Sequence, residues 1–416
     1  MGLAINALGG AARVAVEIRT AAESVQGGYP LSVSRFDATG VPLQGDRGVM
    51  IIGGTGNDMT APNRFVAEVD RFDLSGRWHA MEPLFTARFA PGVCSDGRGG
   101  AIIAGGRDQQ NNYLNTVEWY DDKGNHSYLE PLDQGRYHIT GAVDGSGNAL
   151  FAGGWNNNGA HLIVDCYDSV GAHSMRTPLC RARDAMGVAV DGAGAVIFAG
   201  GLNHSYTASE YTEVDKYDKY GVHTILAPLS EPRGFMGAAT DGDGRVLFAG
   251  GMTHLGRSYI RNAVDRYDIN GVRTTLTPLS TPRAYMTGVA DADGNVIFAG
   301  GVINDLYATD VVDQYDVNGN RTTIEPMRQP TCYYAAVRDS NGTVIFAGGA
   351  MNNRAVNAVE RRVRRGHALI EVPPFAGYQF EEHAKEQKPA DEARGVVVRV
   401  PNRGHFRFGS GKMTIG

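Results

Sequence analysis

Hydrophobic and polar positions follow a unit that recurs along most of this chain, and residues 233–279 show it clearly. The first apolar stretch ends at Asp241–Gly244, where glycines favour a tight hairpin. The next run, 245–249, has no charge after Arg245 and indicates a strand buried on both faces. Apolar and polar residues then alternate over 263–268, which indicates a half-exposed strand. A threonine-rich segment before Pro278 indicates an outer strand. We therefore predict four antiparallel strands within 233–240, 245–249, 263–268 and 273–279.

A glycine pair closes the second strand in every copy. The first glycines of the pairs are Gly53, Gly105, Gly153, Gly200, Gly250, Gly300 and Gly348, at intervals of 52, 48, 47, 50, 50 and 48 residues. Repeats of about fifty residues are typical of propellers built from four-stranded blades. We predict an all-β fold whose main domain, residues 29–373, is one seven-bladed β-propeller rather than two or three separate domains.

The first and last copies are irregular, as terminal units of repeat arrays often are. In the first copy we place the first strand within residues 29–36 and its turn at 37–40. In the last copy Thr331 stands where earlier copies carry an arginine before or within the first strand. These arginines are Arg88, Arg136, Arg183, Arg233 and Arg283.

The unit resembles the kelch repeat. The features that carry the resemblance are an apolar strand running into Gly-Gly, an acidic-x-Tyr-Asp strand such as Asp265–Asp268, and Pro-Leu or Pro-Met followed by arginine. The resemblance covers about five-sixths of the chain and implies a kelch-type propeller. It departs at the position five before the proline, which is usually Trp. This chain has Trp78, His126, His173, His223, Arg273 and Arg321 there.

Composition and charge narrow the classes of partner. The chain has 416 residues, 56 of them Gly, and a net charge of −6, which disfavours a nucleic-acid ligand. No apolar run is long enough for a membrane helix, and the N-terminus lacks the features of a signal peptide, so we expect neither membrane insertion nor export by that route. The four cysteines show neither metal-ligand spacing nor a disulfide framework. They are Cys94, Cys166, Cys180 and Cys332.

We predict no metal and no other cofactor. Histidines at equivalent positions of different blades lie too far apart to bind one zinc ion, so we interpret them as packing residues. Aspartate-rich turns such as Asp241–Gly244 lack the ligand pattern of a calcium loop and are interpreted as hairpin turns.

The resemblance also implies an enzymatic alternative, because some kelch propellers are copper-radical oxidases that need two His, two Tyr and a Cys linked to one Tyr. Here Cys166 and Cys332 each precede a tyrosine directly, and adjacent strand residues point to opposite faces. His138, His204 and His254 could approach one face together with Tyr206 or Tyr259. No pattern fixes a set of ligands, and we assign no catalytic residue and predict a protein that is not an enzyme.

Sequence diversity is concentrated in the loops that follow the glycine pairs, whereas both hairpin turns are nearly the same in all copies. Loops of a rigid scaffold commonly carry binding residues, and aromatic and amide side chains suit a glycan or protein surface. We predict that this face binds the ligand. The candidate residues are Tyr113, Trp155, His204, Tyr206, Tyr259 and Tyr307, together with the five arginines named above. The alternative is that the loops serve architecture only.

Segments at both ends are expected to be β-structured appendages. We divide them into an N-terminal arm, 1–28, a charged linker, 374–394, and a C-terminal β-hairpin, 395–416. Strands are predicted at 12–18, 395–400 and 405–409. The ends could dock to an assembly partner or brace the propeller.

The repetitive array with small β ends has a looser resemblance to kelch-like proteins of tailed-bacteriophage particles. That resemblance implies a noncatalytic recognition or structural subunit, such as a tail or fibre component, in a virion or another extracellular assembly. The alternatives are a copper-radical or other sugar-acting propeller enzyme and a cytoplasmic protein-interaction scaffold.

Overall fold

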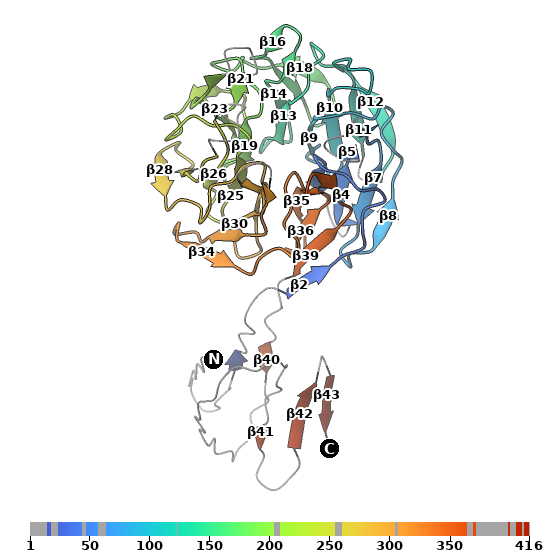
Figure 1. Cartoon of the computed structure of the whole chain (residues 1–416), viewed down its shortest axis with the longest axis vertical. Coiled ribbons are helices and arrows are strands. Elements are labelled where there is room, and N and C mark those ends of the chain that lie inside the picture. Colours follow the sequence, from blue (N-terminus) through green and yellow to red (C-terminus); the bar gives the residue numbers. More distant parts are fainter. Residues whose placement is uncertain are drawn as a thin grey trace. The chain divides into compact units, whose positions relative to one another are not determined.

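The structure is a computed structural model that describes most of the repeat region and short parts of both ends. The described residues are 15–17, 24–43, 47–56, 64–121, 123–203, 209–253, 260–303, 307–363, 369–371, 398–399, 405–409 and 412–415. Within them the chain is all β and contains seven four-stranded antiparallel sheets arranged as the blades of a propeller (Figure 1). The prediction of a seven-bladed β-propeller is confirmed.

Each blade runs outward from the central axis, and the first strands of successive blades contact each other around the ring. Blade 1 contains β3 (Thr39–Pro42), β4 (Val49–Ile52), β7 (Val69–Phe72) and β8 (Trp78–Ala80). Blade 2 contains β9 (Gly92–Ser95), β10 (Ala101–Ala104), β11 (Val117–Tyr120) and β12 (His126–Leu129). Blade 3 contains β13 (Thr140–Val143), β14 (Ala149–Ala152), β17 (Val164–Tyr167) and β18 (His173–Met175).

The same order continues in the next three blades. Blade 4 contains β19 (Gly187–Val190), β20 (Val196–Ala199), β23 (Val214–Tyr217) and β24 (His223–Ile225). Blade 5 contains β25 (Gly237–Thr240), β26 (Val246–Ala249), β27 (Val264–Tyr267) and β28 (Arg273–Leu276). Blade 6 contains β29 (Gly288–Ala290), β30 (Val296–Ala299), β33 (Val312–Tyr315) and β34 (Arg321–Ile324).

Blade 7 is completed by the N-terminal part of the chain. It contains β35 (Ala335–Arg338), β36 (Val344–Ala347), β39 (Val359–Val363) and, as its outermost strand, β2 (Ser24–Gly27). β2 pairs antiparallel with β39 from Ser24 opposite Val363 to Gly27 opposite Glu360. Residues 24–27, which the sequence analysis placed in the N-terminal arm, therefore close the ring.

Short hairpins extend the loops that follow the glycine pairs. They are β5 (Thr55–Gly56) with β6 (Arg64–Phe65), β15 (Trp155–Asn156) with β16 (Gly159–Ala160), β21 (Leu202–Asn203) with β22 (Ser209–Glu210), β31 (Val302–Ile303) with β32 (Tyr307–Ala308), and β37 (Ala350–Met351) with β38 (Arg354–Ala355).

The other described strands belong to a second compact unit formed by residues 1–22 and 365–416, whereas the propeller unit spans residues 23–364. In the second unit β1 (Ala15–Glu17) pairs with β40 (Leu369–Glu371). β41 (Val398–Arg399) pairs with β42 (His405–Gly409), which also pairs with β43 (Lys412–Ile415). β41 and β42 lie within the strands predicted for the C-terminal hairpin, and β43 was not predicted. The charged linker, 374–394, lies outside the described residues.

The core consists of apolar layers between neighbouring blades. All four side chains of β26 are buried, and Phe248 packs with Ile197 and Ala199 of blade 4 in one cluster. Because each second strand is covered on both faces by the adjacent blades, it needs an uncharged sequence. Burial on both faces explains the apolar run before each glycine pair.

The glycine pairs are required where the second strand ends against the next blade. Gly250 and Gly251 have φ of 61° and 99°. A Cβ at Gly251 would lie 2.6 Å from the carbonyl oxygen of Gly234, and one at Gly250 would collide with that of Arg283. Other residues would therefore be strained and sterically blocked at these positions.

A buried ion pair ties the start of each of the first six blades to its third strand. In blade 5 the Arg233 guanidinium donates to Asp265 Oδ2 at 2.9 Å, and both side chains are 0% exposed. The backbone N–H of Ser230 and the hydroxyl of Thr275 donate to the same carboxylate. The carboxylate thus accepts hydrogen bonds from three residues, as a buried charge requires. The other pairs are Arg35–Asp70, Arg88–Glu118, Arg136–Asp165, Arg183–Asp215 and Arg283–Asp313.

The first copy was assigned wrongly. Its inner strand is β3, after Asp37, and residues 29–36 form the connection into it. Arg35 is the counterpart of the repeated arginines, because it pairs with Asp70 of β7 at 2.5 Å. Because Arg35 was not recognised as the repeated arginine, the inner strand of the first copy was predicted several residues too early.

Candidate functional site

The two faces of the propeller differ in their loops. On one face, hairpin turns repeat a single hydrogen-bond pattern: Asp241 Oδ1 accepts from the N–H groups of Asp243 and Arg245, and Asp191 and Asp291 do the same in their own turns. We call this the turn face. The opposite face, which we call the loop face, carries the segments after the glycine pairs and the entrance of the central channel.

The channel entrance on the loop face is a cavity of about 600 Å³. Every blade contributes to its lining one half-exposed residue that lies two positions after the repeated arginine, or after Thr331 in blade 7. These seven mouth residues are Asp37, Ala90, His138, Ala185, Phe235, Tyr285 and Tyr333.

All seven mouth residues have left-handed backbone conformations, with φ between 48° and 55°. The N–H of one residue donates to the carbonyl of the preceding blade's residue, for example from Tyr285 to Phe235 at 3.0 Å and from Asp37 to Tyr333 at 2.8 Å. The fold imposes this conformation on every blade, and glycine or asparagine would adopt it at the lowest cost. The sequence instead places bulky rings at several of these positions, and strained bulky residues are typical of functional sites.

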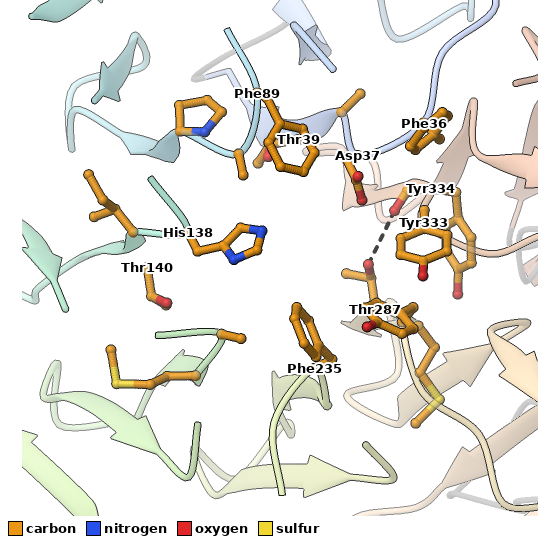
Figure 2. A pocket seen from close by; sticks show the side chains of 18 of the residues that line it. Phe36, Asp37, Thr39, Phe89, His138, Thr140, Phe235, Thr287, Tyr333 and Tyr334 are labelled. Atoms are coloured by element: carbon orange, nitrogen blue, oxygen red, sulfur yellow. Dashed lines mark hydrogen bonds between the residues drawn. The ribbon is translucent and has the colours of Figure 1, made fainter. Parts of the chain in front are cut away.

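Aromatic rings line one side of the mouth as a continuous arc. Centroid separations are 4.5 Å between Phe235 and Tyr285, 4.3 Å between Tyr285 and Tyr333, and 6.1 Å between Tyr333 and Phe36. The Asp37 side chain follows Tyr333 around the ring, and His138 lies across the cavity from it (Figure 2). Among the seven mouth residues, blades 5, 6, 7 and 1 thus contribute three rings and a carboxylate, and Phe36 adds a fourth ring. Small Ala90 and Ala185 flank His138.

The acidic and the basic mouth residue, Asp37 and His138, have different surroundings. Desolvation raises the pKa of Asp37 to about 7, and no ion pair of its carboxylate is found among the described residues. By contrast, His138 Nδ1 lies 3.4 Å from Oδ2 of Asp184, a buried residue of blade 4. The mouth is therefore electrostatically asymmetric.

A second aromatic group, which we call the rim cluster, adjoins the mouth on blades 1 to 3. The Arg107 guanidinium lies 5.3 Å from the Tyr137 ring centroid, 5.6 Å from Phe89 and 6.0 Å from Phe65. Phe89 also lines the mouth. The remaining members, Tyr113 and Trp155, contact Tyr137 at centroid separations of 5.7 and 6.1 Å.

The structure brings together only some of the residues expected at the ligand. Tyr113 and Trp155 meet in the rim cluster with ring centroids 6.2 Å apart. Tyr307 lies in β32 and is 67% exposed. His204, Tyr206, His254 and Tyr259 lie outside the described residues.

The arginines, in contrast, do not reach the surface. Arg88, Arg136, Arg183, Arg233 and Arg283 are each 0% exposed and are paired with acids of their own blades. We therefore leave them out of the proposed ligand surface.

Sequence reasoning missed most of the mouth. Phe235, Tyr285 and Tyr333 were included in strands or connections, and Asp37 was interpreted as part of a turn. The available signal was variability, because the position two after the arginine changes from copy to copy within an otherwise repetitive frame. Variation at a fixed position of a repeat indicates a role other than packing.

The described residues do not fit a copper-radical centre. Cys166 is buried in the layer between blades 3 and 4, and the Cys332 thiol donates to the carbonyl oxygen of Ala350. No group of three His, Cys, Asp or Glu among the described residues is arranged to hold a metal ion. Likewise, the described part of the chain contains no helix long and apolar enough to span a membrane.

Comparison with known proteins does not assign this chain to a family. No protein-family model matches this sequence, and no curated protein matches it significantly.

Proposed function

We propose that this protein is a noncatalytic recognition subunit that binds its ligand on the loop face, at the channel mouth and the adjoining rim cluster. The observation that carries the proposal is that blades with nearly the same packing differ at the mouth, where rings occupy strained positions. A cavity of this volume with an apolar lining and a few polar groups is typical of binding sites.

An array that carries both glycans and peptides tests this proposal. We expect the full chain to bind a subset of spots and the Trp155→Ala variant to lose at least about tenfold in affinity, because aromatic anchors dominate binding energies. Tyr220→Ala is the matched control, since Tyr220 is 77% exposed in a turn of the opposite face. Unchanged binding in Trp155→Ala, or no binding to any spot, contradicts the proposal.

We also propose that the repeat is a divergent kelch unit. Trp78, at the characteristic position of blade 1, donates from Nε1 to Asp70 at 2.6 Å. His173 Nε2 lies 2.8 Å from Asp165 at the same position of blade 3, and its ring stacks on Tyr167. Histidine can thus replace tryptophan as a ring that packs and makes a polar contact with the blade's acid.

The setting that we propose is a virion or similar multi-copy particle, in which the second unit makes the assembly contacts. We expect the full chain to form a discrete oligomer in light-scattering measurements and the fragment 23–364 to be monomeric. The fragment matches the propeller unit, so its fold should be retained. A full chain that is monomeric at the same concentration contradicts this setting.

A further inference from the structure

We infer that the part of the mouth formed by blades 5, 6, 7 and 1 binds an alkylammonium group between the rings of Phe235, Tyr285 and Tyr333 and the carboxylate of Asp37. The inference rests on the proposed function and assigns a ligand class to it. Two sources have this chemistry: the side chain of a lysine in a protein partner, and a quaternary ammonium group such as that of choline.

The geometry supports a cation because the arc combines the two groups that attract one. Aromatic faces attract cations through the ring quadrupole, within about 6 Å of the centroid. Successive ring centroids are 4.5 and 4.3 Å apart with tilts of 36° and 34°, so the rings pack against one another and form one continuous aromatic wall beside Asp37. Asp37 follows directly around the ring and points into the cavity (Figure 2). An ammonium group placed there would compensate the carboxylate that the mouth has desolvated.

The rim cluster provides an internal comparison. There, three rings surround a cation that the chain itself supplies, the guanidinium of Arg107. At the arc, Tyr285 and Tyr333 lie beside the acid Asp37, and among the described residues no Lys or Arg side chain lies over either of these two rings. An external cation beside Tyr285, Tyr333 and Asp37 would therefore add an interaction that the described residues do not make there.

The other titratable groups near Asp37 do not provide a counter-charge. Tyr285, Tyr333 and Cys332 interact electrostatically with it, and burial raises the pKa of both phenols far above neutrality and that of the Cys332 thiol to about 12. They are neutral between pH 6 and 8. His138 lies across the cavity from Asp37, where it contacts Asp184 and its ring meets that of Phe235 at a centroid separation of 5.9 Å.

Saturation-transfer NMR on the full chain, with matched pairs of cationic and neutral probes, tests the inference. The probes are choline against its neutral isostere 3,3-dimethylbutan-1-ol, and Nα-acetyl-lysine methylamide against Nα-acetyl-norleucine methylamide. We expect the cation of at least one pair to bind about tenfold or more tightly than its isostere. The pair that shows the difference identifies the source of the ammonium group.

Variants locate the site. Asp37→Asn should reduce cation affinity at least about fivefold while the fold is retained, because asparagine tolerates the left-handed conformation at φ 54°. Tyr285→Ala should do the same, and Tyr220→Ala on the turn face should have no effect. Equal binding of cations and isosteres, or unchanged affinity in both mouth variants, overturns the inference.

The pH dependence adds an independent readout. Because a carboxyl of pKa about 7 gains its charge between pH 6 and 8, cation affinity should rise about tenfold over this range. The rise should disappear in Asp37→Asn and persist in His138→Gln. If array ligands bind the loop face but cations do not, this inference fails and the proposed function stands. If array binding is unaffected by Trp155→Ala, the proposed function fails.

Discussion

Replacing Arg233 with methionine is expected to lower the free energy of unfolding by about 3–5 kcal/mol. The guanidinium is 0% exposed and donates to Asp265 and to the carbonyl oxygen of Phe248. Its removal leaves the buried carboxylate with only the half-exposed Arg273 guanidinium nearby, at 4.0 Å from Asp265 Oδ1. Methionine fills the space without replacing the hydrogen bonds. Chemical denaturation at pH 7 measures the change.

The stability lost on replacing Arg233 with methionine should depend on pH. Burial alone would raise the pKa of Asp265, but Arg233 and the Ser230 N–H and hydroxyl hold it below its ordinary value in the native chain. A lowered folded-state pKa stabilises the fold above the ordinary carboxyl value and loses that contribution as pH falls. In the variant the Arg233 charge, the largest of the causes that lower the pKa of Asp265, is gone, so this pKa rises and the carboxyl binds a proton more readily. Part of the lost stability should therefore return between pH 7 and pH 5.

Arg181→Met is the matched control, because Arg181 pairs with Glu213 at 2.6 Å but is 54% exposed. Exposed ion pairs contribute about 0–1 kcal/mol, so this variant should be nearly as stable as the native chain. Equal losses in the two variants would mean that burial does not control the contribution of these pairs.

Blade 7 lacks the repeated arginine, and it supports the interpretation that the buried acid needs a positive charge beside it. Thr331 replaces the repeated arginine, yet the acid of the third strand, Glu360, is not left uncompensated. Arg362, two residues further along β39 and 1% exposed, donates from Nε to Glu360 at 3.2 Å. The positive charge comes from a different sequence position, which indicates that the buried acid requires one.

The blades were predictable because their signals are local and repeated. The uncharged run of β26 and the turn at Asp241 occur in similar form in most copies, so each copy supports the assignment of the others. Ring closure has no such support. Residues 24–27 lack the motif of an outer strand, and only the unpaired edge of β39, about 335 residues later, gives them a partner.

The candidate site was less predictable, for a different reason. The Arg233–Asp265 pair joins residues 32 positions apart, and the sequence alone does not show that both side chains are buried. The arginines therefore looked like ligand-binding residues. Tyr285 and Tyr333 resembled ordinary strand or connection residues, because a left-handed φ cannot be inferred for a bulky residue from its type. The loop aromatics Tyr113 and Trp155 were found because loop diversity is visible in one sequence.

Deleting residues 1–27 is expected to lower the free energy of unfolding of the propeller by about 2–6 kcal/mol. The deletion removes β2, whose four residues pair with β39, and each ladder hydrogen bond contributes about 0.5–1.5 kcal/mol. It also leaves β39 as an unpaired edge that another chain can occupy. We expect the denaturation midpoint to fall at a lower denaturant concentration. We also expect concentration-dependent association in size-exclusion chromatography.

Deleting residues 1–22 is the control that separates ring closure from a general effect of shortening the chain. This form keeps β2 and every described residue of the propeller unit. If β2 closes the ring, the shorter deletion should leave the denaturation midpoint of the propeller unchanged, and the five additional residues should account for the whole loss. Equal midpoints for the two deletions would mean that blade 7 is stable with three strands. The propeller would then be held closed by the apolar layers on either side of blade 7, in which Val49 and Ile51 of blade 1 pack with Ile345, and Val344 packs with Val312 of blade 6.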